Sequence, residues 1–269
     1  MSYYNGKRVL ITGAGSGIGA LMARELASRG AEVIVTARRI EAARKVSREI
    51  RKQGGRAIPM LLDVSDLDSI PAFRDRLHDK AGPVDILINN AGVVFGGEFE
   101  KVGLAEHLNT LQINTMGLVA MSHAFMDDLL QATRGHLVNI CSASAFVALP
   151  YGSTYAASKW AVLGFSESLR LEMKERGVDN VAVTTVCPSY IDTGMFEGVR
   201  NPLFTPMLSP QKVVRSILRA TKHGEALVQE PMIVRSLDLL KGALPRPVWD
   251  EVSLRTGVAS SMKSWKGKH

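Results

Sequence analysis

The sequence predicts an α/β fold in which helices cover both faces of one parallel, doubly wound sheet. Short apolar stretches alternate with longer segments that carry apolar residues at helical spacing, and this alternation runs along most of the chain. A glycine-rich turn joins the first apolar stretch to the first helical segment. No repeat, linker or low-complexity tract interrupts the pattern, so we expect a single domain over residues 1–269.

The pattern of apolar residues places the individual elements. The expected strands are 8–12, 32–37, 56–62, 84–88, 136–141, 181–187 and 225–229. The expected helices are 18–28, 40–53, 67–80, 103–133, 153–176, 210–222 and 232–244. Segment 189–209 is rich in turn residues yet strongly apolar, and a loop of that length in a compact domain is usually functional. We expect it to bind substrate, and we expect 231–269 to form an apolar and basic C-terminal extension.

Composition and charge narrow the class of protein. Hydrophobic residues make up 46% of the chain and charged residues 22%, which is ordinary for a soluble globular domain. No apolar run is long enough to span a membrane, no secretory leader is visible, and the two cysteines are too few for a disulfide framework. These features predict a cytoplasmic protein.

The net charge of +7 is confined to the end of the chain. Residues 1–199 hold 21 basic and 21 acidic side chains, whereas residues 200–269 hold 12 basic and 5 acidic ones. One interpretation is a solvated basic surface, and the other is a surface that contacts anionic partners.

Tyr155 and Lys159 form the candidate chemical centre. Residues four apart on a helix lie on one face, one turn from each other. An ammonium near a phenol favours the phenolate and lowers the tyrosine pKa, which suits proton exchange at a carbonyl or alcohol oxygen. The pair alone is also compatible with an ordinary helix surface.

The glycine-rich turn is the candidate phosphate site. Glycines at 13, 15, 17 and 19 lie between the first expected strand and helix, where they let the backbone approach a pyrophosphate at the helix N-terminus. This favours a Rossmann-like fold, although their spacing differs from the usual dinucleotide fingerprint.

The loop resembles that of the short-chain dehydrogenase/reductase family. Further family motifs follow in order between residues 6 and 195. They are Asp63-Val64, Asn89-Asn90-Ala91-Gly92, Asn114, Ser142, Tyr155 with Lys159, and Pro188 with Thr193. The sequence departs from the family at Ser189, where glycine is usual.

The resemblance implies a role for each of four catalytic residues. Tyr155 would be the general acid/base, and Ser142 would hydrogen-bond the substrate oxygen and stabilise charge that develops there. Lys159 would bind the nicotinamide ribose and lower the Tyr155 pKa, and Asn114 would hold a water of the proton relay. The cofactor would supply the hydride.

The expected cofactor-binding residues come from every part of the match. They are Gly13, Gly15, Ser16, Gly17, Ile18, Gly19, Arg38, Arg39, Asp63, Val64, Asn90, Ala91, Gly92, Tyr155, Lys159, Pro188, Ile191 and Thr193. Enzymes that select NAD place an acidic residue near the end of the second strand, where this chain has Ala37. Arg38 follows, and a guanidinium suits a phosphate, so we expect NADP rather than NAD. The alternative is that both arginines are merely solvated.

The expected substrate is an apolar alcohol, ketone or aldehyde, because the candidate pocket residues are mostly apolar and lack a basic anchor. These residues are Val94, Ser144, Leu149, Tyr151, Met195, Phe196 and Phe204. The segment after Thr193 resembles the retinol and 17β-hydroxysteroid dehydrogenase branch of the family.

Partners follow from the same features. The family implies a homodimer or homotetramer, in which long helices pair across a two-fold axis. Ile233, Leu237, Leu240 and Leu244 share one face of an expected helix beside Arg235 and Lys241, which predicts core packing, a subunit contact or weak peripheral membrane binding. We expect neither a metal site nor nucleic-acid binding. The alternative function is a non-catalytic NADP-binding or membrane-surface protein.

Overall fold

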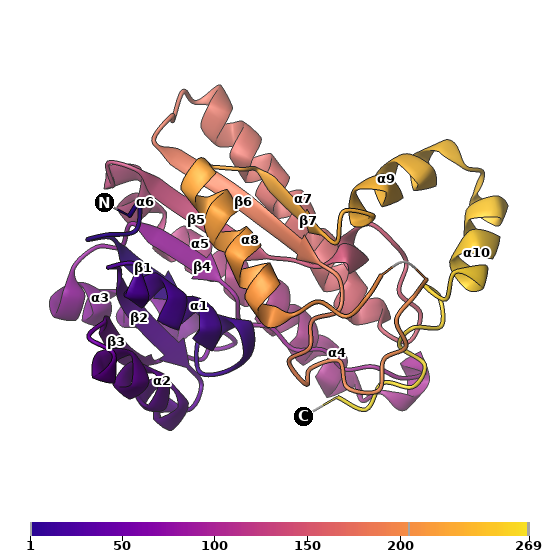
Figure 1. Ribbon diagram of the computed structural model, residues 1–269, viewed down its shortest axis with the longest axis horizontal. Coiled ribbons are helices and arrows are strands. Elements are labelled where there is room, and N and C mark those ends of the chain that lie inside the picture. The colour runs from indigo at the N-terminus through magenta and orange to yellow at the C-terminus, as the bar shows by residue number, and fades with distance from the viewer. Residues whose placement is uncertain (1, 204, 268–269) are drawn as a thin grey trace.

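The computed structural model describes residues 2–203 and 205–267, and its centre is one parallel sheet in the order β3-β2-β1-β4-β5-β6-β7 (Figure 1). The strands are β1 (Arg8–Ile11), β2 (Glu32–Ala37), β3 (Arg56–Leu61), β4 (Ile86–Asn89), β5 (Gly135–Ile140), β6 (Val181–Pro188) and β7 (Leu227–Glu230). The order reverses between β1 and β4, and in such sheets ligands bind beyond the carboxyl ends of the strands at this point. The predicted fold class is confirmed.

Helices cover both faces of the sheet, as Figure 1 shows. They are α1 (Gly17–Ser28), α2 (Ile40–Lys52), α3 (Ile70–Ala81), α4 (Leu104–Leu111), α5 (Leu118–Ala124), α6 (Met126–Gln131), α7 (Ser153–Glu175), α8 (Pro210–His223), α9 (Val234–Ala243) and α10 (Arg246–Arg255). Strand residues alternate between two cores: Val9 and Ile11 pack with α1, α2 and α8, whereas Leu10 packs with α3, α5 and α6.

The expected continuous helix over 103–133 is wrong, because the structure breaks it into three helices. A π-helical segment, Gln112–Gly117, separates α4 from α5, and Phe125 leaves helical geometry (φ −108°, ψ 6°) between α5 and α6. The widened turn places Asn114 against Val93, whose N–H donates to Asn114 Oδ1 at 2.8 Å. The break therefore coincides with a predicted site residue.

The C-terminal extension also differs from the prediction, because α10 follows α9. Val234, which was outside the predicted apolar face, is fully buried, while Ile233 and Leu240 are 40% and 44% exposed. Leu244 is partly buried against the apolar cluster that contains Val234 and Trp249, and the side chain of Leu237 lies outside the described part of the structure. The expected apolar face is thus divided between the core and the surface. None of the described helices has both the length and the apolar character needed to cross a membrane.

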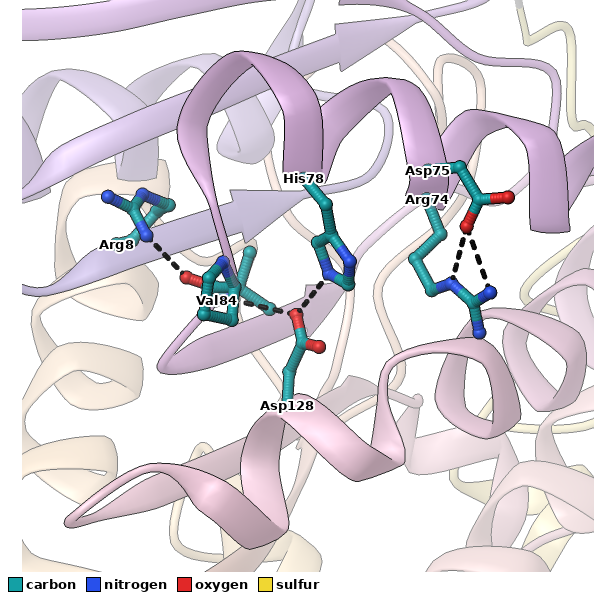
Figure 2. Close-up of polar contacts among 7 residues, drawn as sticks. Arg8, Arg74, Asp75, His78, Val84 and Asp128 are labelled. Carbon is teal, nitrogen blue, oxygen red and sulfur yellow. Dashed lines mark hydrogen bonds and ion pairs between the residues drawn. The ribbon is translucent and has the colours of Figure 1, made fainter.

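A buried carboxylate contacts the segment before β4, which begins two residues later than predicted (Figure 2). Asp128, on α6, accepts hydrogen bonds from the Val84 N–H at 2.8 Å and from His78 Nε2 at 2.9 Å. Arg8 donates to the Pro83 carbonyl at 2.6 Å. These contacts join α3 and α6 to the segment before β4. Asp85, in that segment, also bonds both neighbouring strands, because its N–H donates to the Arg8 carbonyl at 2.9 Å and its carbonyl accepts from the His136 N–H at 3.0 Å.

We predict that Asp128→Ala lowers the free energy of unfolding by about 2 kcal/mol, because it leaves the buried Val84 N–H without an acceptor. Asp75→Ala is the matched control, since the Arg74–Asp75 pair in Figure 2 lies at the surface. We expect its effect to stay below about 0.5 kcal/mol. Urea denaturation of the two variants measures both values, and equal losses would contradict the role assigned to Asp128.

Candidate active site

A cavity of about 410 Å³ opens at the carboxyl ends of the strands. Every residue predicted to bind the cofactor lines it, as do the predicted catalytic residues Ser142, Tyr155 and Lys159. The loops after β1 to β6 bring these residues together, as the reversal of strand order requires.

The glycine-rich loop leaves no room for side chains. A Cβ on Gly15 would lie 2.8 Å from the Ala42 Cβ, and a Cβ on Gly19 would lie 2.5 Å from Asn90 Nδ2 and 2.6 Å from the Gly13 carbonyl oxygen. The backbone of this loop is therefore exposed to the cavity at the N-terminus of α1. This arrangement fits the pyrophosphate of a nicotinamide dinucleotide.

Thr12 and Asn90 join the carboxyl ends of β1 and β4. The Thr12 hydroxyl accepts hydrogen bonds from the backbone N–H groups of Asn90 and Ala91, both at 2.9 Å. In return, Asn90 Nδ2 donates to the carbonyls of Thr12 at 2.9 Å and Gly13 at 3.2 Å. These hydrogen bonds form a reciprocal clamp between Thr12 and Asn90 beneath the loop, and the expected contact of Asn90 with the cofactor site stays a prediction.

Arg38 and Arg39 lie at the far end of the cavity, just after β2. Both side chains are exposed and line the cavity, and the nearby Ala37 contributes no carboxylate. Asp63 is held locally, because its Oδ1 accepts hydrogen bonds from the Ser65 N–H at 3.0 Å and the Ser65 hydroxyl at 2.6 Å. This end of the cavity has a basic edge.

Tyr155 and Lys159 lie in the first two turns of α7 and are both buried. The Lys159 Nζ lies 5.7 Å from the centroid of the Tyr155 ring and donates to the Ile140 carbonyl at 2.9 Å. Burial raises the pKa of Tyr155 above its ordinary value, and a hydrogen bond with Ser142 opposes part of that rise. Burial also lowers the pKa of Lys159. The net shift of the tyrosine pKa is therefore opposite to the one expected from a neighbouring ammonium alone.

Asn114 is buried but does not line the cavity. Its Oδ1 accepts from the Val93 N–H, while its Nδ2 donates to the Val93 carbonyl at 2.9 Å and to the Ser158 hydroxyl at 3.1 Å. The side-chain amide is thus bound to protein groups and fixes the segment that follows β4. Its predicted role in holding a water stays a prediction.

The predicted substrate residues divide into two groups. Ser144, Leu149, Met195 and Phe196 line the cavity. Val94 and Tyr151 lie outside the lining and belong to the apolar cluster around Tyr155. Phe204 lies outside the described residues.

Residues 256–267 contribute to the cavity, which the sequence analysis missed. Val258 and Ser261 line it, as do Tyr190 and Val234. This segment binds the 189–209 loop through the backbone: the Arg200 N–H donates to the Ser261 carbonyl at 3.0 Å, and the Lys266 N–H to the Glu197 carbonyl at 2.8 Å. No local sequence motif marks such pairing, because the two paired segments are far apart in sequence.

Tyr190 connects residues 256–267 to Tyr155 through a series of side-chain contacts. Its hydroxyl lies 2.7 Å from the Ser261 hydroxyl. Its ring packs edge-on against Phe196, and Phe196 packs edge-on against Tyr155, with centroids 5.1 Å and 6.1 Å apart. In the sequence, the only signal that pointed to Tyr190 as a site residue was its position directly after Pro188-Ser189.

The departure at Ser189 leaves the turn intact. Among the described non-glycine residues, only Tyr151 has a positive φ, so Ser189 occupies backbone space that any residue adopts. Its N–H donates to the Glu230 carbonyl at 2.7 Å, which extends the pairing of β6 with β7. A glycine is therefore not required here.

The site has no feature of a metal centre within the described residues. No group of three or more histidine, cysteine, aspartate or glutamate side chains there could hold an ion. Cys141 and Cys187 are buried free thiols on adjacent strands or their ends.

The sequence profile described as short chain dehydrogenase matches residues 7–203. The chain belongs to this family. It is 34% identical over 265 residues to human "Short-chain dehydrogenase/reductase 3", which covers 97% of this chain and 87% of that protein. It is 31% identical over 264 residues to "Retinol dehydrogenase 10-B" of Danio rerio, which covers 89% of this chain and 79% of that protein. Rat "Estradiol 17-beta-dehydrogenase 11" also matches, at 28% identity over 255 residues, covering 94% of this chain and 85% of that protein, so the predicted branch of the family is confirmed.

Solved structures agree with this assignment. A metagenomic short-chain oxidoreductase in complex with NADP has 33% identity and a TM-score of 0.71, and the match covers 85% of this chain and 96% of that one. A short-chain dehydrogenase/reductase from Burkholderia phymatum in complex with NAD has 24% identity and a TM-score of 0.81, with 97% and 99% covered, and shares the fold. The protein is thus a short-chain oxidoreductase whose structural neighbours bind nicotinamide cofactors.

Proposed function

We propose that this protein is an NADP(H)-dependent oxidoreductase that interconverts an apolar alcohol and its ketone or aldehyde, with Tyr155 as the general acid/base. One observation carries the proposal. Tyr155 and Ser142 line the same cavity as the glycine-rich loop, and the wall beyond them is largely apolar. A non-catalytic cofactor-binding protein would not need a buried Tyr155, Lys159 and Ser142 around one cavity.

The bound cofactor would give or take the hydride at the substrate carbon. During reduction, the Tyr155 hydroxyl donates its proton to the carbonyl oxygen. The Ser142 hydroxyl donates a hydrogen bond to the same oxygen and stabilises the negative charge that develops there. Lys159 would bind the ribose hydroxyls of the cofactor and orient its nicotinamide, and its hydrogen bond to the Ile140 carbonyl at 2.9 Å holds its Nζ at the cavity.

The raised pKa of Tyr155 bears on the direction of proton transfer. A phenol whose pKa lies above its ordinary value is protonated at neutral pH and ready to donate. Oxidation of an alcohol instead requires the phenolate. We therefore expect kcat/KM for reduction to stay flat from about pH 6 to 9, and kcat/KM for oxidation to rise with pH by up to about tenfold per unit.

We predict that Tyr155→Phe lowers kcat for NADPH-dependent ketone reduction by at least about 100-fold, because it removes the transferable proton and keeps the ring. The measurement is NADPH oxidation with a panel of apolar ketones and aldehydes. NADPH binding, followed by its fluorescence, should change less than about threefold. Turnover near that of the wild type would refute the assignment of Tyr155, and absence of wild-type turnover across the panel would refute the enzymatic proposal.

The preference for NADP is proposed from the basic edge after β2. Arg38 and Arg39 are exposed there, and Ala37 offers no carboxylate to a ribose 2′-hydroxyl. A guanidinium binds phosphate oxygens with two parallel hydrogen bonds, so Arg38 is placed to bind the 2′-phosphate. The neighbour in complex with NADP adds support, although another neighbour is in complex with NAD.

We predict that Arg38→Ala weakens NADPH binding by about tenfold or more and changes NADH binding by less than about twofold, because only NADPH carries the phosphate. Fluorescence titration with each cofactor measures both effects. Arg44→Ala is the matched control, since Arg44 is an exposed arginine of α2 outside the cavity. Ala37→Asp should move the preference toward NAD. Equal losses of both cofactors in Arg38→Ala would contradict the proposal.

The proposed substrate class rests on the cavity wall. The residues beyond Tyr155 and Ser142 are mostly apolar, including Val147, Leu149, Met195, Phe196 and Val258. An apolar wall with a few placed hydroxyls suits a hydrophobic molecule with one reacting oxygen. Relatives named as retinol and estradiol dehydrogenases support the same class. We propose the 189–209 loop and residues 256–267 as the substrate-facing wall.

We also propose that the protein assembles as a homodimer or homotetramer through α4 and α7. Trp160, Gly164 and Leu171 recur at spacings of four and seven along one face of α7, and all three are exposed. Leu104 and Leu108 on the adjoining α4 are 72% and 58% exposed. Because Gly164 has no side chain, a second helix can approach α7 closely at this point.

We predict that the double variant Leu108→Arg, Leu171→Arg is a monomer in light scattering at micromolar concentration, whereas the wild type is a dimer or tetramer. A charge on each helix would have to be buried at the proposed contact. Leu254→Arg is the control, because Leu254 is 62% exposed and belongs to α10, a helix that lies away from α4 and α7 in Figure 1. A monomeric wild type would refute the proposed assembly.

We also propose that the protein is cytoplasmic and binds weakly to membrane surfaces. Met232 is 73% exposed beside Ile233 and the exposed Arg235 at the start of α9. Apolar and basic side chains together favour anionic lipid surfaces, and the charge contribution weakens with salt. The expected result is sedimentation with anionic vesicles at low salt only, and no sedimentation under any condition would refute it.

A further inference from the structure

Ser142 lies between two backbone carbonyls that are bound by consecutive residues of α7. Lys159 Nζ donates to the Ile140 carbonyl, two residues before Ser142, at 2.9 Å. Trp160 Nε1 donates to the Ser144 carbonyl, two residues after Ser142, at 2.6 Å. These bonds attach the chain on both sides of Ser142 to the helix that carries the proposed general acid/base.

A third carbonyl of this turn is held by α9, far along the chain. Lys241, in the last turn of α9, donates from its Nζ to the Phe146 carbonyl at 3.1 Å. The same ammonium lies 4.0 Å from the centroid of the Trp160 ring, which is a cation–π contact. Lys241 therefore contacts the turn directly and also contacts the side chain that holds the Ser144 carbonyl.

The attachment of α9 to the domain does not depend on Lys241. Val234, in the first turn of α9, is fully buried, and Leu244, directly after the helix, is partly buried against the same apolar cluster. Trp249 of α10 belongs to that cluster as well. Lysine is rarely buried, because its ammonium then loses hydration. The partial burial of Lys241 at the turn therefore needs a reason other than attachment of the helix.

The geometry of the turn determines where the Ser142 hydroxyl donates. The Ser144 N–H donates to Ser142 Oγ at 3.1 Å, and the Ala145 N–H donates to the Ser142 carbonyl at 3.0 Å. Because Oγ accepts from the backbone, its own hydrogen remains for the bond with Tyr155 or with a substrate oxygen. If the turn loosened, the bond to Oγ would be lost and the hydroxyl would be free to rotate away.

We propose that Lys241 is a positioning residue for the reaction. It holds the Phe146 carbonyl and the Trp160 ring, and the turn fixed in this way keeps the Ser142 hydroxyl directed at the reacting oxygen. Lys241 acts from outside the cavity, since it is not part of the lining. This inference rests on the proposed function, because it assumes that Ser142 bonds the substrate oxygen.

The first test measures ketone reduction by Lys241→Met, which keeps the length of the side chain and removes the ammonium. We expect kcat at saturating NADPH to fall about tenfold, because a misplaced hydroxyl stabilises the transition state less well. The Kd of NADPH should change less than about twofold, since no cofactor-binding residue is altered. Lys241→Arg keeps a cation and its donors at this position and should restore kcat to within about threefold of the wild type.

Arg246→Met is the matched control, because Arg246 is an exposed cation of the neighbouring helix α10. Its kcat should stay within about twofold of the wild type. A role of Lys241 limited to attachment of α9 predicts the opposite result for Lys241→Met, a lower midpoint of urea denaturation with unchanged kcat.

Amide hydrogen exchange of residues 142–147 tests the turn without turnover. In Lys241→Met these amides should exchange at least about tenfold faster, because the turn opens more readily once the Phe146 carbonyl is released. Exchange in Arg246→Met should match that of the wild type. Unchanged kcat, or a fall in kcat without faster exchange, would overturn the role of Lys241. Absence of wild-type turnover would refute the proposed function, while the exchange rates would still decide whether Lys241 fixes the turn.

Discussion

The reciprocal clamp between Thr12 and Asn90 is the constraint on which the site depends. It joins the ends of β1 and β4, the two paired strands between which the strand order reverses. On one side it holds the glycine-rich loop, since Asn90 Nδ2 also bonds the Gly13 carbonyl. On the other side, the bond from the Ala91 N–H to Thr12 fixes the start of the segment that follows β4. Asn114 holds the same segment at Val93. Cofactor loop and catalytic wall are therefore positioned by one set of hydrogen bonds.

Burial is the main cause of the pKa shifts of Tyr155 and Lys159, the proposed catalytic pair. It raises the pKa of Tyr155 and lowers that of Lys159, so desolvation moves both groups toward their neutral forms. The Ser142 hydrogen bond works against this for the tyrosine, and the Ile140 carbonyl accepts from the lysine. The apolar surroundings that support the proposed apolar substrate are thus also the surroundings that raise the pKa of Tyr155.

The sequence allowed the sheet and the lining of the cofactor site to be predicted because both depend on local signals. Alternating apolar stretches place strands, and short motifs at strand ends converge wherever parallel strands share an edge. The break at Gln112–Gly117 carries no such signal, because the wide turn is stabilised by the distant Val93. The shift of the Tyr155 pKa was missed for the same reason. It depends on burial by Phe196, Tyr190 and Met262, which tertiary packing alone brings to that ring.

The position of Ser261 in the cavity wall has a consequence for the order in which the protein is made. The glycine-rich loop, the clamp beneath it and the first four strands of the sequence leave the ribosome early, and they contain most of the phosphate-binding backbone. Val258 and Ser261 emerge after all seven strands. Val258 and Ser261 are therefore synthesised after the glycine-rich loop and the clamp beneath it, and until then the apolar end of the cavity lacks this part of its wall. The last residues of the chain supply that part of the wall.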